Sequence, residues 1–161
     1  MPSVLFVCTA NRFRSPLAAA YFQQMLGSSD RARPWSVDSA GTWTSSGLQV
    51  LPEVLLIARK HDLDLSGHRS KVVSESLLSA QDLILVMEAG HREALQHEFS
   101  SIFDRVYLFS QVTEGRFYDI PDMTDSVEAM MDVGENIHEL VQTGFGNIYA
   151  LTIHLHATRQ N

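Results

Sequence analysis

The chain has 161 residues, 45% of them hydrophobic, and a formal net charge of −7, which is typical of one globular domain with a substantial core. The acidic balance argues against nucleic acid as a partner, and the single cysteine excludes an intramolecular disulfide and a cysteine-based metal cluster. Without a basic leader or an apolar run of membrane-spanning length, the sequence predicts one cytoplasmic domain over residues 1–161, with no membrane partner.

The first predicted elements are a strand and a helix joined by a short loop. The apolar run Val4–Val7 predicts a buried strand over residues 3–8. Ser15 is a favourable helix N-cap and Pro16 suits the first helical position, so a helix is predicted over 15–27, where Gly27 can end it. Residues 8–14 then connect a strand end to a helix N-terminus.

Strand and helix patterns continue to alternate along the chain. They predict strands at 36–39, 83–87 and 106–109, helices at 48–61, 89–99 and 126–141, and a helical turn at 74–78. Gly144 and Gly146 are expected to break the last helix, leaving 144–161 as an uncertain C-terminal extension for which a further helix is preferred over a strand. The alternation predicts an α/β fold, a four-stranded parallel sheet flanked by helices on both faces.

The loop that begins at Cys8 has the chemistry of an anion-binding site. In parallel sheets ligands lie at the carboxyl ends of the strands, where Cys8 is expected. Free backbone N–H groups at a helix N-terminus favour negative charge, which stabilises a thiolate, and Arg14 adds two donors suited to phosphate oxygens. A lone cysteine after an apolar strand is otherwise an ordinary buried hydrophobe, so the combination carries the inference.

The segment Cys8-Thr9-Ala10-Asn11-Arg12-Phe13-Arg14-Ser15-Pro16 resembles the signature loop of the low-molecular-weight protein tyrosine phosphatases. Further segments resemble that family in the same order over roughly residues 3–142, namely Ser39–Thr42, Gly67–Lys71, Asp82–Met87 and Ile120–Asp122. Each segment is weak evidence alone, but their conjunction is specific.

The resemblance implies a role for each residue of the site. Cys8 would attack phosphorus, Arg14 would stabilise the transition state, Ser15 would donate to the thiolate, and Asp122 would act as general acid and then base, with Asp119 as the second choice. Thr9, Ala10, Asn11, Arg12 and Phe13 would line the substrate site, with Trp43, Phe117 or Tyr118 as an aromatic wall. Asn11, Ser39 and His68 would form a hydrogen-bond network that supports the loop.

Four positions depart from the family pattern. Ala10 stands where glycine is common and would be strained if its φ were positive. Arg12 adds a cation that favours doubly anionic substrates or acidic flanking residues and argues against phosphoarginine. Met123 follows Asp122 in place of proline, and Phe13 replaces a common second cysteine that could protect Cys8 from oxidation.

The predicted function is hydrolysis of phosphotyrosine in a protein, or of an aryl phosphate, through a phosphocysteine, with inorganic phosphate as the product. No cofactor and no metal are expected, because the histidines show no ligand pattern in the sequence. Two alternatives remain open: an arsenate reductase recycled by a small thiol, and a non-catalytic phosphate-binding module. The sequence gives no oligomeric state.

Overall fold

The protein is built on a four-stranded parallel sheet, as the sequence predicts. The computed structural model describes residues 1–30 and 33–161. The strands are β1 (Ser3–Cys8), β2 (Ser36–Gly41), β3 (Leu83–Val86) and β4 (Val106–Leu108), in the spatial order β2-β1-β3-β4. Because β1 is central, Cys8 lies between two neighbouring strand ends, with Gly41 opposite it on β2 and Val86 opposite Val7 on β3.

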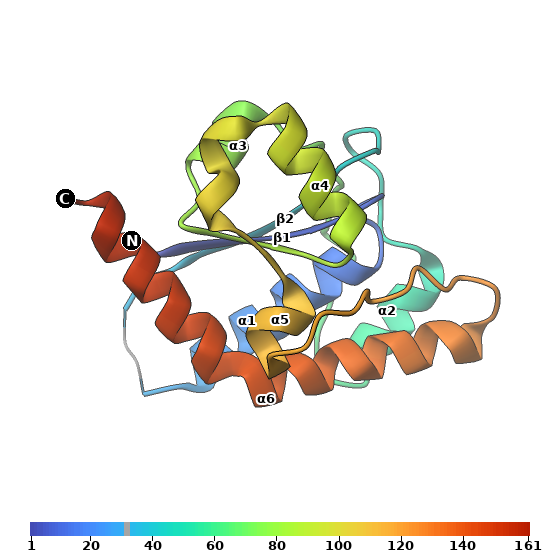
Figure 1. The fold of residues 1–161 in the computed structure, drawn as a ribbon. Helices are drawn as coiled ribbons and strands as arrows, with labels where there is room; N and C mark the ends of the chain where they lie inside the picture. Colours follow the sequence, from blue (N-terminus) through green and yellow to red (C-terminus); the bar gives the residue numbers. More distant parts are fainter. Residues whose placement is uncertain (31–32) are drawn as a thin grey trace.

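Helices cover both faces of this sheet. They are α1 (Arg14–Ser28), α2 (Pro52–Arg59), α3 (Glu75–Ser79), α4 (Ala89–Glu98), α5 (Phe109–Glu114) and α6 (Val127–Arg159), with a 3-10 helix, η1, at Ser100–Arg105. Figure 1 shows α3 and α4 on one face and α1, α5 and α6 on the other.

The side chains of β1 alternate between two cores. Val4, Phe6 and Cys8 pack with α1 and α6, whereas Leu5 and Val7 pack with α3, α4 and η1. This period of two is what a central strand of a covered sheet requires. Cys8 therefore points toward the α1 face, above the start of that helix.

The N-terminal ends of two helices differ from the prediction. Phe13 occupies the N-cap position of α1 without a side-chain cap, and Ser15 lies in the first turn, so the prediction of a Ser15 cap was wrong. Helix α2 begins at Pro52 rather than near 48, because Leu51 is extended (φ −60°, ψ 144°), as a residue before proline prefers. The hydroxyl of Ser15 is thereby free for a different partner.

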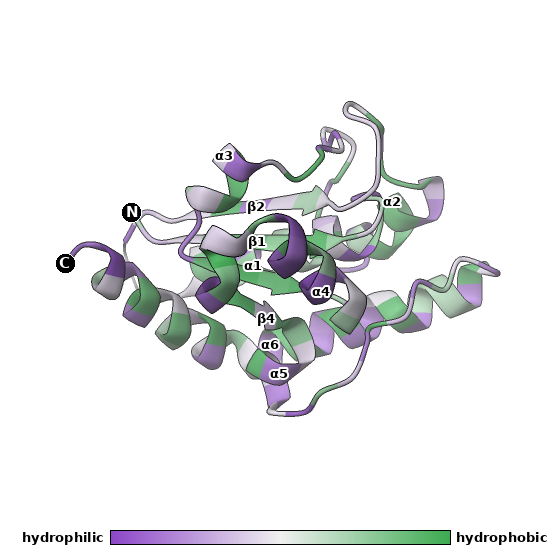
Figure 2. Cartoon of the chain, turned by 45° about the horizontal axis from the view of Figure 1, so that its top comes forward, coloured by the Kyte–Doolittle hydropathy of each residue, from purple (hydrophilic) through white to green (hydrophobic). Residues whose placement is uncertain are grey.

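The predicted break at Gly144 and Gly146 was also wrong. Helix α6 runs without interruption to Arg159, so the extension is helical but is not a separate element. Apolar and polar residues alternate along its whole length (Figure 2), and its buried residues continue past both glycines to Ile148 and Thr152. Tertiary burial outweighs the weak helix propensity of two glycines.

The C-terminal end of α6 is fixed to the sheet through Asp82. This buried carboxylate accepts hydrogen bonds from Arg159 (2.7 Å), His156 (2.9 Å) and the backbone N–H of Ser3 (2.9 Å). Burial acts to raise the pKa of Asp82, but these hydrogen bonds together hold it below its ordinary value. The two chain ends consequently lie near each other (Figure 1). Across the two described ranges, no helix, not even α6, combines the length and apolarity needed to cross a bilayer.

Candidate active site

The loop after β1 closes over a small cavity at the carboxyl end of the sheet. Cys8 is the last residue of β1 and is only 2% exposed. The cavity, of about 110 Å³, is lined by Cys8, Ala10, Arg12, Phe13, Arg14, Leu51, Asp122 and Thr124. The fold thus brings Asp122, far away in the sequence, to the loop that follows Cys8.

The sulfur of Cys8 contacts the hydroxyl of Ser15. Their Sγ···Oγ distance is 2.9 Å, and the same hydroxyl accepts a hydrogen bond from Asn11 Nδ2 at 2.9 Å. Because Asn11 donates to this oxygen, the Ser15 proton has two acceptors within reach, the sulfur of Cys8 at 2.9 Å and the carbonyl oxygen of Ala40 at 3.4 Å, of which the sulfur is the nearer. Ser15 is free to make this contact because it does not cap α1.

Asn11 fixes the shape of the loop. It is fully buried with a left-handed backbone (φ 57°), and its Nδ2 also donates to Ser39 at 2.9 Å while its Oδ1 accepts from the backbone N–H of Lys71 at 3.0 Å. Asparagine tolerates this conformation better than most residues. Ala10 is not among the described residues with positive φ, so it carries no such strain.

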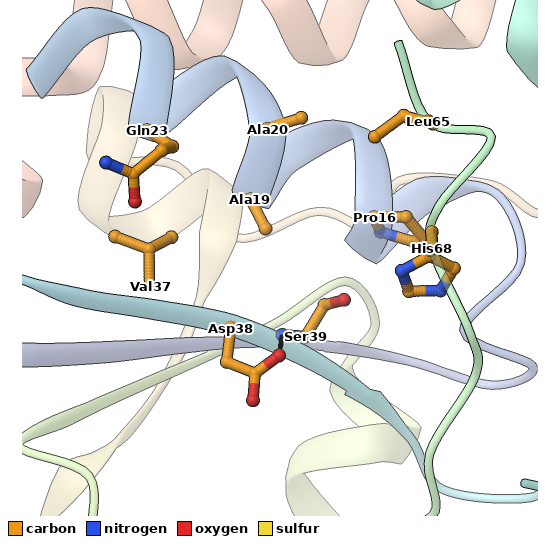
Figure 3. A pocket seen from close by; sticks show the side chains of 9 residues that line it. All are labelled: Pro16, Ala19, Ala20, Gln23, Val37, Asp38, Ser39, Leu65 and His68. Carbon is orange, nitrogen blue, oxygen red and sulfur yellow. Dashed lines mark hydrogen bonds between the residues drawn. The ribbon is translucent and has the colours of Figure 1, made fainter. Parts of the chain in front are cut away.

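His68 supports the same loop from outside. Its Nε2 lies 2.8 Å from the carbonyl oxygen of Asn11, and because a carbonyl only accepts, this nitrogen carries the proton. Burial lowers the pKa of His68, and the neutral ring suffices for the bond. Figure 3 shows His68, from the segment after α2, and Ser39, from β2, beside Pro16, Ala19 and Ala20 of α1 around a second hollow of about 240 Å³.

Arg14 is held rigidly although it is charged. Its side chain is 1% exposed, and one terminal nitrogen donates to the carbonyl of Ile120 (2.7 Å) and to Glu88 (3.0 Å). The other terminal nitrogen lies 3.4 Å from Thr9 Oγ1 and 3.7 Å from an Asp122 oxygen. Two partners therefore hold one nitrogen, while the other faces the cavity where an anion would bind.

Two residues of this constellation escape prediction from the sequence, Glu88 and His91. His91 Nδ1 accepts the backbone N–H of Glu88 at 3.1 Å, so its Nε2 carries the proton and donates to Thr9 Oγ1 at 2.8 Å. Burial lowers the pKa of His91 and outweighs the opposing charge of Glu88, which keeps the ring neutral. The available signal was the position of Glu88, just past the end of β3 at the same sheet edge as Cys8.

The two candidate acids have different surroundings. Asp122 lines the Cys8 cavity with its side chain 49% exposed. Asp119 instead accepts the backbone N–H of Ala89 at 2.8 Å, at the start of α4. The structure therefore places Asp122 at the cavity and gives Asp119 a positioning contact.

Trp43, Phe117 and Tyr118, predicted as an aromatic wall, do not line the Cys8 cavity. Trp43 is 83% exposed and lines a neighbouring hollow with Ala10, Arg12 and Leu48. Phe117 is exposed, and Tyr118 packs against the main core. Arg12, whose Nε donates to the carbonyl of Gln49 at 2.7 Å, lines both hollows. Arg12 thus lies between the Cys8 cavity and the hollow that Trp43 lines.

Comparison with known proteins agrees with this geometry. The chain matches the family described as low molecular weight phosphotyrosine protein phosphatase over residues 3–149. The chain belongs to this family.

The similar proteins are named for different substrates. A putative low molecular weight protein-tyrosine-phosphatase of Klebsiella pneumoniae is 33% identical over 120 residues, which cover 74% of this chain and 78% of the relative. A protein-arginine-phosphatase of Bacillus subtilis strain 168 is 26% identical over 140 residues, 86% of this chain and 91% of the relative. The solved structure of Vibrio vulnificus Wzb in complex with benzylphosphonate is 30% identical, with a TM-score of 0.77, covering 88% of this chain and 94% of that one.

Proposed function

We propose that the chain is a cysteine-dependent phosphatase that hydrolyses phosphotyrosine in proteins, or other aryl phosphates, through a phosphocysteine at Cys8. The observation that carries the proposal is the contact of Cys8 Sγ with Ser15 Oγ at 2.9 Å, in a cavity shared with Arg14 and Asp122. Nucleophile, oxyanion donor and candidate acid thus share one enclosure, which is the minimum that this chemistry needs.

The proposed first step transfers the phosphoryl group to sulfur. The Cys8 thiolate attacks phosphorus in line, an S–P bond forms, and the P–O bond to the aryl group breaks. The cavity-facing nitrogen of Arg14 and the loop amides hold the equatorial oxygens, and Asp122 gives its proton to the departing phenolate.

The second step returns the enzyme to its starting state. The Asp122 carboxylate takes a proton from a water molecule that attacks phosphorus, the S–P bond breaks, and inorganic phosphate leaves. The Ser15 proton, directed at sulfur, stabilises the thiolate as it departs. A thiolate without this donor would be less stable and therefore a poorer leaving group, so Ser15 acts mainly here.

Three features support aryl esters over phosphoarginine. A phosphoarginine substrate would bring its own guanidinium to a cavity already lined by Arg12 and Arg14, so like charges would meet there. The relative from Klebsiella pneumoniae carries tyrosine phosphatase in its name, and benzylphosphonate, bound to Vibrio vulnificus Wzb, combines an aromatic ring with a tetrahedral anion.

The test is steady-state hydrolysis of an aryl phosphate in the presence of a chelator. We expect turnover by the wild type, none by Cys8→Ser, and slower turnover of phosphoarginine. Activity retained by Cys8→Ser would contradict the mechanism, and faster turnover of phosphoarginine would contradict the substrate class.

The acid is tested with a series of leaving groups. Asp122→Asn should lose most activity on the ester with the poorest leaving group, because that phenolate most needs a proton. Asp119→Asn is the matched control, since its amide oxygen can still accept the N–H of Ala89. Equal losses across the series for Asp122→Asn would place the acid elsewhere.

The same cavity would admit arsenate, which is also a tetrahedral oxyanion. Because Cys8 is the single cysteine of the chain, reduction of arsenate would require an external thiol such as glutathione or mycothiol. Arsenate-dependent thiol oxidation exceeding aryl phosphate turnover would favour that alternative. Phosphopeptide binding without any turnover would favour a binding module.

A further inference from the structure

We propose that His61, Glu135 and His138 form a binding site for a divalent transition-metal ion, with zinc as the ion the donors suit best. The three side chains lie outside the lining of the Cys8 cavity and play no part in the proposed reaction. Their ligand atoms all lie within 4.8 Å of one another. The proposal therefore concerns a second site and is independent of the proposed function.

Two elements bring these residues together. Glu135 and His138 are three positions apart on α6 and so share one face of that helix. His61 follows the end of α2, and its Nε2 lies 2.9 Å and 3.1 Å from the two carboxylate oxygens of Glu135. Its ring stacks on that of His138, with centroids 3.6 Å apart and planes 14° apart.

The site has support from α1 on its inner side. The carbonyl of His61 accepts a hydrogen bond from Gln24 of α1 at 2.7 Å, which fixes the backbone that carries this ligand. Tyr21, also on α1, packs edge-to-face against both imidazole rings, with centroids 5.5 Å and 4.8 Å away. Held backbones and packed rings are what pre-organise ligands.

Tyr21 supplies a second, independent observation. Its side chain is 1% exposed, yet its hydroxyl has no hydrogen-bond partner among the described residues. A buried hydroxyl normally has a partner, and leaving one unpaired costs free energy. A water molecule on a metal ion at the adjacent imidazoles would provide one.

The donor set selects the class of ion. Two imidazole nitrogens and one carboxylate are typical zinc ligands and leave a fourth position for water. Zinc bonds of about 2.1 Å place neighbouring ligand atoms about 3.4 Å apart. Since the present atoms lie within 4.8 Å of one another, their separations need to shorten by no more than about 1.4 Å. The two rings must also rotate out of their stack so that both nitrogens face the ion. The exposed carboxylate of Glu135 leaves an open path for the ion.

A bound ion would strengthen a connection that the hydrogen bond between His61 and Glu135 already makes. It would fix the segment after α2 to α6, against α1, whose first turn carries Arg14 and Ser15. Binding to the folded chain alone stabilises it by linkage. The sequence does not reveal this site, because His61 and Glu135 are 74 positions apart.

The test is calorimetric titration of zinc into the Cys8→Ser protein, because the Cys8 thiolate is itself a zinc ligand. We expect one zinc ion per chain and a rise in the unfolding temperature that a chelator reverses. Glu135→Gln and His138→Ala should each weaken binding by about tenfold or more. His154→Ala, an exposed histidine farther along α6, is the matched control and should bind as tightly as the parent.

Titration with cobalt gives a readout that does not depend on stability. The visible absorption bands of protein-bound Co²⁺ should appear in the Cys8→Ser protein. They should be lost when Glu135→Gln is added, although glutamine has the same shape as glutamate. The proposal is overturned if the Cys8→Ser protein shows no saturable binding at millimolar zinc, or if folded His138→Ala and Glu135→Gln bind zinc as tightly as the His154→Ala control.

Discussion

Two glycines of α6, Gly144 and Gly146, should respond in opposite directions to the same substitution. A Cβ at Gly144 would lie 2.6 Å from both Cα and Cβ of Thr113 on α5, whereas a Cβ at Gly146 meets nothing within 4 Å. Thr113 cannot easily retreat, since it is buried and its hydroxyl donates to the carbonyl of Phe109 at 2.8 Å. The contact includes a backbone atom, so no rotamer change relieves it.

The magnitudes follow from two opposing terms. Alanine in place of glycine inside a helix gains about 0.5–1 kcal/mol, the full effect expected for Gly146→Ala. Overpacking at Gly144 costs about 1–3 kcal/mol, so Gly144→Ala should lose up to about 2.5 kcal/mol net. With a urea m value of about 2 kcal/mol/M, the midpoint should rise by about 0.4 M for Gly146→Ala and fall by up to about 1.2 M for Gly144→Ala.

The assay is urea denaturation followed by circular dichroism, with equal m values for the three proteins as the condition for comparing midpoints. Equal stabilisation by both substitutions would refute the close approach of α5 and α6 at Gly144. Gly144 would then only lower the helix propensity of α6, with no packing reason to be glycine.

Three further predictions concern the supports of the active site. Glu88→Gln keeps an acceptor but removes the charge that faces Arg14, so kcat should fall roughly ten- to a hundredfold, the range of about 1.5–3 kcal/mol for a charge-assisted hydrogen bond; unchanged kcat would deny Glu88 a positioning role. Asn11→Ala, at φ 57°, should destabilise the fold by about 3 kcal/mol in urea titrations, and Asn11→Gly by less, because glycine relieves the backbone strain; the reverse order would contradict the argument. Because burial lowers the pKa of His91 below 6.5, the unfolded chain takes up a proton before the folded one. The free energy of unfolding should therefore fall as pH falls from about 6.5 through the lowered pKa, and it should fall less in His91→Gln. Identical pH profiles of the two proteins in chemical denaturation would contradict this role of His91.

The order of the elements was predictable because burial patterns are local in the sequence. The apolar strand Val4–Val7 and the alternation of strands and helices indicated a parallel sheet, and the structure confirms it. The continuity of α6 was not predictable in this way. Gly144 looks like a helix breaker until Thr113 of another helix is known to lie against it, and that contact exists only in the folded chain.

In the active site, too, contacts within one local motif were predictable and contacts between distant residues were not. Cys8, Arg14 and Ser15 belong to one short motif, so their proximity was predicted from spacing, and the left-handed Asn11 agrees with the tolerance of asparagine for that conformation. Glu88 contacts Arg14 although the two residues are 74 positions apart, and no local sequence pattern predicts such a pair. The helix cap predicted for Ser15 was wrong, because a serine at a helix start can either cap the helix or contact a neighbouring side chain, and here its hydroxyl lies beside Cys8.

The most direct test of the account is the mass of the protein during turnover. Asp122→Asn, mixed with an aryl phosphate that has a good leaving group and then quenched in acid, should carry one added phosphoryl group that maps to Cys8, since attack proceeds while the activation of water is impaired. Steady turnover without any adduct on Cys8, or an adduct on another residue, would contradict the central claim that the sulfur at the base of this cavity is the nucleophile.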